Sequence, residues 1–338
     1  MKARGWLFAM LAMAVTGAGL YLYWDYRTFL DNPLNVTEEE IVFEVNPGDS
    51  VTVVAERLKQ RNVLESARAV LYLQAYARLT HVAHRIQVGE YALKPGMNPR
   101  TLLTKLVAGD VVQYALTIVE GWTFRQMLAA IADHEKIEQT LQGLGDVEIM
   151  TQLGYPELHP EGRFFPETYH FPARTTDVAV LKRAFDTMER HLREVWEQRV
   201  DDLPIKNPYQ VLILASIIER ETALPREYRE VAGVFVRRLR KGMLLQTDPT
   251  VIYGMGDTFD GNIRRSDLRR DTPYNTYTRS GLPPTPIALP GKGALMAAVN
   301  PAPGNTFYFV ARGDGSHAFS RTLKEHNRNV RRYQLNQP

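Results

Sequence analysis

The sequence predicts an α+β protein in which an apolar N-terminal helix precedes a small α/β domain and a larger mixed domain. Three observations support this. An uncharged apolar stretch opens the chain at residues 5–24, and short strand and helix patterns alternate from residue 41 to residue 119. The remainder, residues 120–338, combines long helical patterns with loops rich in proline and tyrosine. Such a mixture of element types in separate blocks is typical of α+β architecture.

The composition narrows the class of protein. Of 338 residues, 44% are hydrophobic, which is enough to bury a core. Lysine and arginine number 41 against 38 acidic residues, and this small excess does not predict nucleic-acid binding. Cysteine is absent, which excludes disulfides, thiolate catalysis and thiol-ligated metals and suits an oxidising compartment.

The first 24 residues read as a membrane anchor. The stretch from Gly5 to Trp24 has the length of a bilayer-spanning helix, and Tyr21, Tyr23 and Trp24 lie at its end as an interfacial belt would. The positive residues at positions 2 and 4 place a cytoplasmic stub at 1–4 and the rest of the chain outside. A cleaved signal peptide is the alternative, but the stretch is long for one and lacks a clear small-x-small site. We expect a polar connector over 25–40.

Residues 41–119 predict a small α/β domain. A strand at 41–45 is followed by a Gly-Asp-Ser turn and a helix ending at Leu58, in which Asp49 or Ser50 supplies the N-cap oxygen. A helix at 67–79, a strand at 88–93, a helix over 98–108 and a strand at 111–119 follow by the same criteria. The segment from Val45 to Val51 resembles the opening of a LysM carbohydrate-binding module. The resemblance implies glycan contact, and a purely structural role is the equal alternative.

Helices dominate the middle of the chain. We predict a helix starting near Phe124 and a charged surface helix over 178–202, whose apolar residues recur on one face. The run from Tyr209 to Ile218 is almost wholly apolar and follows Pro208, which predicts a buried helix. A further helix spans 228–241, where Gly242 suits the cap and the basic residues at the end complement the helix dipole.

Glu219 is the first candidate catalytic residue. It comes at the end of the apolar run, on the same helical face as Leu212, Ala215 and Ser216. Burial there would disfavour the charged form and raise the pKa, as a general acid for glycosidic bonds requires. An ion pair with a neighbouring arginine is the plainer alternative. The loops beyond residue 245 are rich in the amides, hydroxyls and tyrosines that bind sugars.

Taken together, these motifs identify a family. The chain contains Ala-Ser-Ile-Ile-Glu-Arg-Glu at 215–221, Leu-Gln-Thr-Asp-Pro-Thr-Val-Ile-Tyr-Gly at 245–254 and Tyr-Asn-Thr-Tyr at 274–277, with Gly-Leu-Pro-Pro at 281–284. It also contains Glu-Gly-Arg-Phe-Phe-Pro-Glu-Thr-Tyr at 161–169, Asn-Pro-Ala at 300–302 and Gly-Ser-His-Ala-Phe-Ser at 315–320. In this order the motifs resemble the YceG-like family of endolytic murein transglycosylases over nearly the whole chain. The LysM-like part is the weakest portion of the match.

The resemblance implies a function and a place in the cell. The family cleaves the β-1,4 bond between N-acetylmuramic acid and N-acetylglucosamine and leaves a 1,6-anhydro end, and its catalytic glutamate falls on Glu219. The resemblance further implies a catalytic domain with a substrate groove at 120–338, held in the periplasm by a single inner-membrane span. Its partners would be peptidoglycan glycan strands and peptidoglycan synthases, with a role in terminating nascent strands, and no cofactor is required.

Several residues remain to be assigned. Our candidates for gripping the sugars are Gln246, Asp248, Tyr274, Asn275 and Tyr277. Asp248 could instead be a nucleophile, although its neighbours Thr247 and Pro249 favour a site-organising or helix-capping acid. His317 and His326 lack the spacing of a zinc site, so we predict no metal. The alternatives to a transglycosylase are a non-catalytic peptidoglycan-binding scaffold and a lysozyme-type hydrolase.

Overall fold

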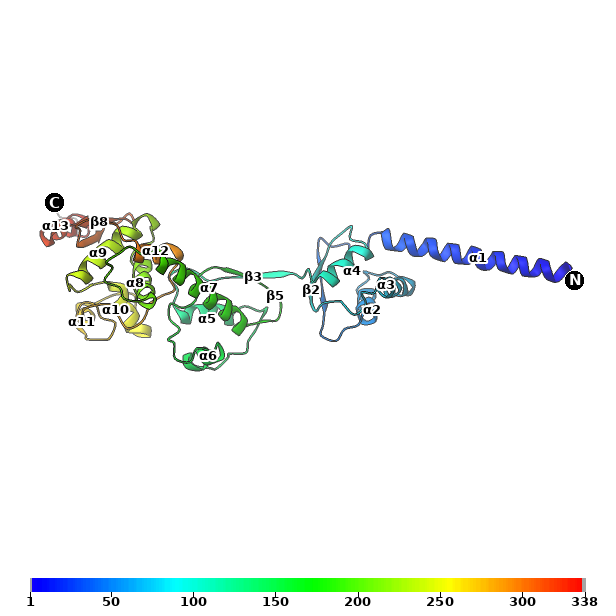
Figure 1. Cartoon of the computed structure of the whole chain (residues 1–338), viewed down its shortest axis with the longest axis horizontal. Helices are drawn as coiled ribbons and strands as arrows, with labels where there is room; N and C mark the ends of the chain where they lie inside the picture. The colour runs from blue at the N-terminus through cyan, green and yellow to red at the C-terminus, as the bar shows by residue number, and fades with distance from the viewer. Residues whose placement is uncertain (1, 336–338) are drawn as a thin grey trace. The chain divides into compact units, whose positions relative to one another are not determined.

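The computed structural model describes residues 2–335 and divides the chain into two compact units. The first unit extends to Tyr114 and includes Phe171–Ala173, and the second comprises Ala115–His170 and the residues from Arg174 onward. The boundary therefore lies inside strand β3 (Gln113–Thr117), five residues before the domain boundary predicted after residue 119. Figure 1 shows the helices and strands of each unit.

The first unit begins with helix α1 (Lys2–Asp31), which is long and apolar enough to cross a membrane from Gly5 onward. The side chains from Gly5 to Trp24 are exposed, as the anchor prediction requires. The predicted connector from residue 25 starts later, because α1 continues to Asp31. Leu30 is 1% exposed, and Asp31 pairs with Arg100 at 2.8 Å, so the end of the helix is held by the unit. Met1, within the predicted stub at 1–4, lies outside the described residues.

The rest of the first unit is a strand–helix–helix–strand motif followed by a helix. Its elements are β1 (Ile41–Val45), α2 (Val51–Gln60), α3 (Ala67–Leu79), β2 (Gly89–Leu93) and α4 (Pro99–Ala108). Strands β1 and β2 pair antiparallel, from Ile41 opposite Leu93 to Val45 opposite Gly89. Of the two predicted N-cap residues, Asp49 and Ser50, it is Ser50 that caps α2: its hydroxyl accepts from the Val53 N–H. These elements match the predicted order, and the LysM-like assignment stays a prediction.

The second unit contains mostly helices, together with short two-stranded sheets. Its elements after β3 are α5 (Phe124–Ala132), β4 (Ile137–Glu138), α6 (Asp146–Gln152), β5 (Thr168–Pro172), β6 (Thr175–Thr176), α7 (Asp177–Glu197), α8 (Pro208–Glu221), α9 (Tyr228–Arg240), α10 (Asp248–Met255), α11 (Arg265–Arg269), α12 (Lys292–Val299), β7 (Tyr308–Ala311), β8 (His317–Ser320) and α13 (Leu323–Tyr333). Short 3₁₀ turns cover Pro225–Glu227 and Gly256–Thr258. Strand β3 pairs with β5, β4 with β6, and β7 with β8. The surface helix predicted to reach residue 202 ends at Glu197.

Helix α8 lies at the centre of the second unit, in contact with α7, α9, α10 and α12 (Figure 1). Every residue from Val211 to Ile218 is buried. A helix that is apolar on all sides needs such surroundings, because each face must be covered. The packing confirms the buried helix predicted from the apolar run and brings the end of α8, at Glu219, to the surface of the core.

Ser216 is the polar exception among the buried α8 residues. It is 0% exposed, and its hydroxyl donates to the Ile213 carbonyl at 2.7 Å and accepts from the Ile287 N–H at 3.0 Å. The hydroxyl thus has a partner both as donor and as acceptor, as a buried polar group requires. This contact ties α8 to the segment that leads into α12.

Candidate active site

Glu219 lies in the last turn of α8 and is partly buried. Its Oε1 accepts a 2.7 Å hydrogen bond from the Tyr228 hydroxyl, and its Oε2 accepts a 2.9 Å bond from the Gly291 N–H. Burial raises the pKa of Glu219, and the two hydrogen bonds oppose this because they favour the carboxylate. The raised pKa is the property that the sequence predicted for this position.

Two loops enclose this carboxyl: the loop before α5, which contains Gly121, and the loop before α12, which contains Leu289. Gly121 adopts a left-handed backbone with φ +80°, and its N–H donates to the Leu289 carbonyl at 2.9 Å, while its carbonyl accepts from the Arg220 guanidinium at 3.2 Å. The Leu289 N–H in turn donates to the Trp122 carbonyl at 2.7 Å. Segments more than 70 residues away in sequence therefore fix the surroundings of Glu219.

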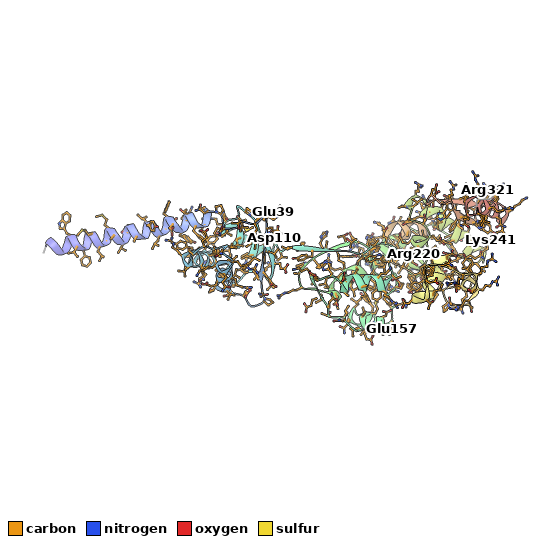
Figure 2. All side chains as sticks on the ribbon, turned by 180° about the vertical axis from the view of Figure 1, so that it is seen from behind. Glu39, Asp110, Glu157, Arg220, Lys241 and Arg321 are labelled. Atoms are coloured by element: carbon orange, nitrogen blue, oxygen red, sulfur yellow. The ribbon has the colours of Figure 1, made fainter. Side chains whose placement is uncertain are left out.

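A cavity of about 640 Å³ opens next to Arg220, which Figure 2 labels. Residues of α5, of α10 and of the loops around Glu161 and Tyr274 line it. Tyr253 and Tyr274 meet edge to face there, with ring centroids 4.9 Å apart. Aromatic faces beside polar groups are the usual lining of a ligand pocket.

Glu161 is a buried acid in this cavity that our site assignment did not include. It is 4% exposed, and its carboxylate accepts from the Phe124 N–H at 3.0 Å and from the Tyr253 hydroxyl at 3.1 Å. Burial raises its pKa to about 7. The Glu-Gly-Arg-Phe-Phe-Pro motif that begins with Glu161 was the available sequence signal.

A second cavity, of about 510 Å³, is lined in part by the loop before α10. Its lining includes Glu221, Arg238, Gln246, Asp248 and Tyr277. Tyr277 donates a 2.6 Å hydrogen bond to Asp248, which occupies the first turn of α10. Burial raises the pKa of Glu221 to about 7.

The structure separates the predicted sugar-binding residues. Gln246, Asp248 and Tyr277 line the second cavity, whereas Tyr274 lines the first. Asn275 lines neither: it is 1% exposed and its amide donates to the carbonyls of Asp267, Leu268 and Arg270. Asn275 therefore holds its own loop together.

The histidines have local partners. Nδ1 of His317 lies 2.7 Å from a carboxylate oxygen of Glu227, which can only accept, and the backbone N–H of His317 donates to the same carboxylate at 3.1 Å. His326 stacks on Tyr308 with centroids 5.4 Å apart. Among residues 2–335 no group of three or more histidine or acidic side chains is placed to hold a metal ion.

Comparison with known proteins agrees with the motifs. The model of the YceG-like family matches residues 43–332. The chain is 32% identical to an endolytic murein transglycosylase of Bacillus subtilis, over 93% of this chain and 90% of that protein. It is 24% identical to an endolytic murein transglycosylase of Streptococcus pneumoniae, over 95% of this chain but 63% of that protein. A crystal structure of a putative YceG-like protein from Listeria monocytogenes superposes with a TM-score of 0.51 at 28% identity, covering 86% of this chain and 99% of that one. The match to the family model spans both units, and the chain belongs to the YceG-like family.

Proposed function

We propose that this chain is a lytic transglycosylase that cleaves the β-1,4 bond between N-acetylmuramic acid and N-acetylglucosamine in peptidoglycan, with Glu219 as its acid and base. Two relatives carry the name endolytic murein transglycosylase, and this supports the enzyme class. The observation that carries the residue assignment is the partly buried Glu219 carboxyl, whose pKa burial raises.

The surroundings of Glu219 suit a carboxyl that must act in both forms. Burial favours the acid, which the first step needs to protonate the leaving glycosidic oxygen. The donors Tyr228 and Gly291 favour the carboxylate that results. That carboxylate then takes the proton of the muramyl C6 hydroxyl while O6 bonds to C1, which closes the 1,6-anhydro ring. The C1–O4 bond breaks, no water is consumed and Glu219 returns to its starting form.

The two cavities supply candidate sugar contacts. We infer that Tyr274, with Tyr253, contacts sugar rings in the 640 Å³ cavity, and that Gln246, Asp248 and Tyr277 do so in the 510 Å³ cavity. Asn275 shapes the loop between them. The hydrogen bond from Tyr277 orients Asp248, which supports a substrate-contacting or organising role for this acid.

The first unit would place the reaction at the membrane. Helix α1 supports a single inner-membrane span with the second unit in the periplasm. A tethered enzyme remains near the point where new strands emerge, so we propose that it terminates strands beside peptidoglycan synthases. The strand–helix–helix–strand motif of the first unit is a candidate LysM-like glycan contact.

The test is digestion of purified glycan strands by the full chain in detergent, followed by mass spectrometry of the products. Wild type is compared with Glu219→Gln and with Glu157→Gln, which removes an exposed charge elsewhere in the second unit (Figure 2). We expect anhydro-muramyl ends from wild type and Glu157→Gln and none from Glu219→Gln. Reducing ends would show a lysozyme-type hydrolase instead, and strand binding without cleavage would show a scaffold.

A further inference from the structure

A second acidic side chain lies beside Glu219. Glu120 precedes the Gly121 turn and is exposed. A Cβ built on Gly291 would overlap the carboxyl of Glu120, so this carboxyl lies directly against the Gly291 backbone. The N–H of the same glycine donates to Oε2 of Glu219 at 2.9 Å. The carboxyl groups of Glu120 and Glu219 therefore meet at Gly291.

The backbone holds Glu120 in this place. The next residue, Gly121, bonds through its N–H to the Leu289 carbonyl and through its carbonyl to Arg220. A Cβ on Gly121 would also lie 3.9 Å from Cγ of Glu219, which shows how closely the turn packs on the end of α8. The position of Glu120 is thus set by the same contacts that enclose Glu219.

The titratable groups that face Glu219 come from three elements. Tyr228 on α9 hydrogen-bonds to it, Arg220 is its neighbour on α8, and Glu120 approaches from the loop before α5. After burial and the two hydrogen bonds, Glu120 acts to raise the pKa of Glu219, while Arg220 acts to lower it. Glu120 also raises the pKa of Tyr228, so its charge acts on both members of the Tyr228–Glu219 hydrogen bond.

We propose that Glu120 is a positioning residue for Glu219: its negative charge keeps Glu219 in the acid form until a glycosidic oxygen is within reach. This rests on the proposed transglycosylase function. A negative charge close to a carboxyl group disfavours the ionised form of that group. Glu120 is exposed and Glu219 is partly buried, so the charge of Glu120 adds to the effect of burial in favouring the acid form of Glu219.

Glu120 touches neither substrate nor reacting atoms in this assignment. A purely structural role is the alternative, because Glu120 also lies at the N-terminus of α12, where a carboxylate complements the helix dipole. A structural role would change stability and leave the titration of Glu219 unchanged. The pH profile separates the two.

The experiment measures kcat/KM for glycan-strand cleavage from pH 5 to pH 9 with the full chain in detergent. For Glu120→Gln we expect the alkaline limb to move to lower pH, with activity at pH 8 reduced about threefold to tenfold and activity at pH 5 nearly unchanged. Gly291→Ala has an allowed backbone, with φ −78°, and displaces the Glu120 carboxyl without removing it, so its limb should move in the same direction. Glu157→Gln should match wild type. An unmoved limb in Glu120→Gln, whatever its thermal stability, would overturn the proposal.

A second readout does not depend on cleavage. A water-soluble carbodiimide labels protonated carboxyl groups, and peptide mass spectrometry reports labelling of Glu219 as a function of pH. The loss of labelling should occur at lower pH in Glu120→Gln than in wild type. If wild type cleaves no strand, the proposed function fails, and this labelling still decides whether Glu120 controls Glu219. Identical labelling curves for wild type and Glu120→Gln would show that Glu120 does not affect the ionisation of Glu219.

Discussion

The Tyr228 hydroxyl donates a 2.7 Å hydrogen bond to Oε1 of Glu219 across the turn between α8 and α9. Tyr228 is 6% exposed, so water competes little for its hydroxyl. The bond selects one orientation of the carboxyl and favours its ionised form. It opposes the effects of burial and of Glu120.

Tyr228→Phe should therefore move the titration of Glu219 in the direction opposite to Glu120→Gln. Loss of the donor raises the pKa of Glu219, so the alkaline limb of the kcat/KM profile should shift to higher pH. The carboxylate would lose a charge-assisted hydrogen bond of about 1.5–3 kcal/mol, and kcat should fall because the second step of the proposed mechanism needs that carboxylate. Tyr209→Phe, at the other end of α8, is the matched control. A limb that stays in place or moves to lower pH would contradict this account.

Glu161 should make the stability depend on pH. Its pKa is about 7 in the folded state and 4.5 in the unfolded reference, so the folded chain holds the extra proton between these values. The free energy of unfolding should therefore fall as pH rises from about 4.5 to 7, by an amount on the order of 3 kcal/mol from this group. Below pH 4.5 the contribution is fully present.

Glu161→Gln should remove the share of this dependence that comes from Glu161, while the share that comes from Glu221, whose pKa burial also raises to about 7, should remain. The amide keeps an oxygen that can accept from Phe124 or Tyr253 and carries no charge to bury. Urea unfolding of the full chain in detergent at pH 5 and pH 8 should show a smaller difference for the variant than for wild type. Equal differences would mean that Glu161 ionises normally in the folded chain.

Asn275 should matter for stability more than for sugar affinity. Its buried amide donates to three backbone carbonyls, and Asn275→Ala leaves these acceptors without this donor, at a cost of about 2–4 kcal/mol. We expect a lower urea midpoint and faster proteolysis at 265–275, with KM unchanged in the molecules that remain folded. Tyr277→Phe, which removes the partner of Asp248, is the contrasting variant and should raise KM with less loss of stability. A raised KM with normal stability in Asn275→Ala would restore Asn275 as a direct sugar contact.

Ser216→Ala should weaken the link between α8 and the segment before α12. The Ile287 N–H loses its acceptor in a site with no exposure, which costs about 1–3 kcal/mol of unfolding free energy. Activity should also decrease, because this segment leads to the Gly291 N–H that binds Glu219. Ser216→Cys preserves the volume more closely and should lose less. Unfolding curves and cleavage rates measured on the same samples check both effects, and unchanged stability would show that the bond is dispensable.

The sequence by itself determined the helices with local signals. Helix α8 starts at Pro208 and contains the predicted, almost wholly apolar run, and helix α3 has the predicted bounds of Ala67–Leu79. Caps and periodicity depend on residues within a few positions, so they can be read along the chain. The family motifs were equally visible, and the family match is confirmed. Glu219 as the catalytic residue remains a prediction.

Only the tertiary structure decided which groups surround each side chain. Helix α1 extends past Trp24 because Leu30 is buried in the first unit. No sequence pattern near residue 25 predicts that contact. Asn275 was predicted to contact sugar, but its side-chain amide donates to backbone carbonyls of its own loop. Glu120 and Gly291 reach Glu219 from 99 and 72 residues away, through packing and backbone hydrogen bonds that form only when the chain is folded. Burial and long-range contact set the pKa of a carboxyl, and neither is a local property of sequence.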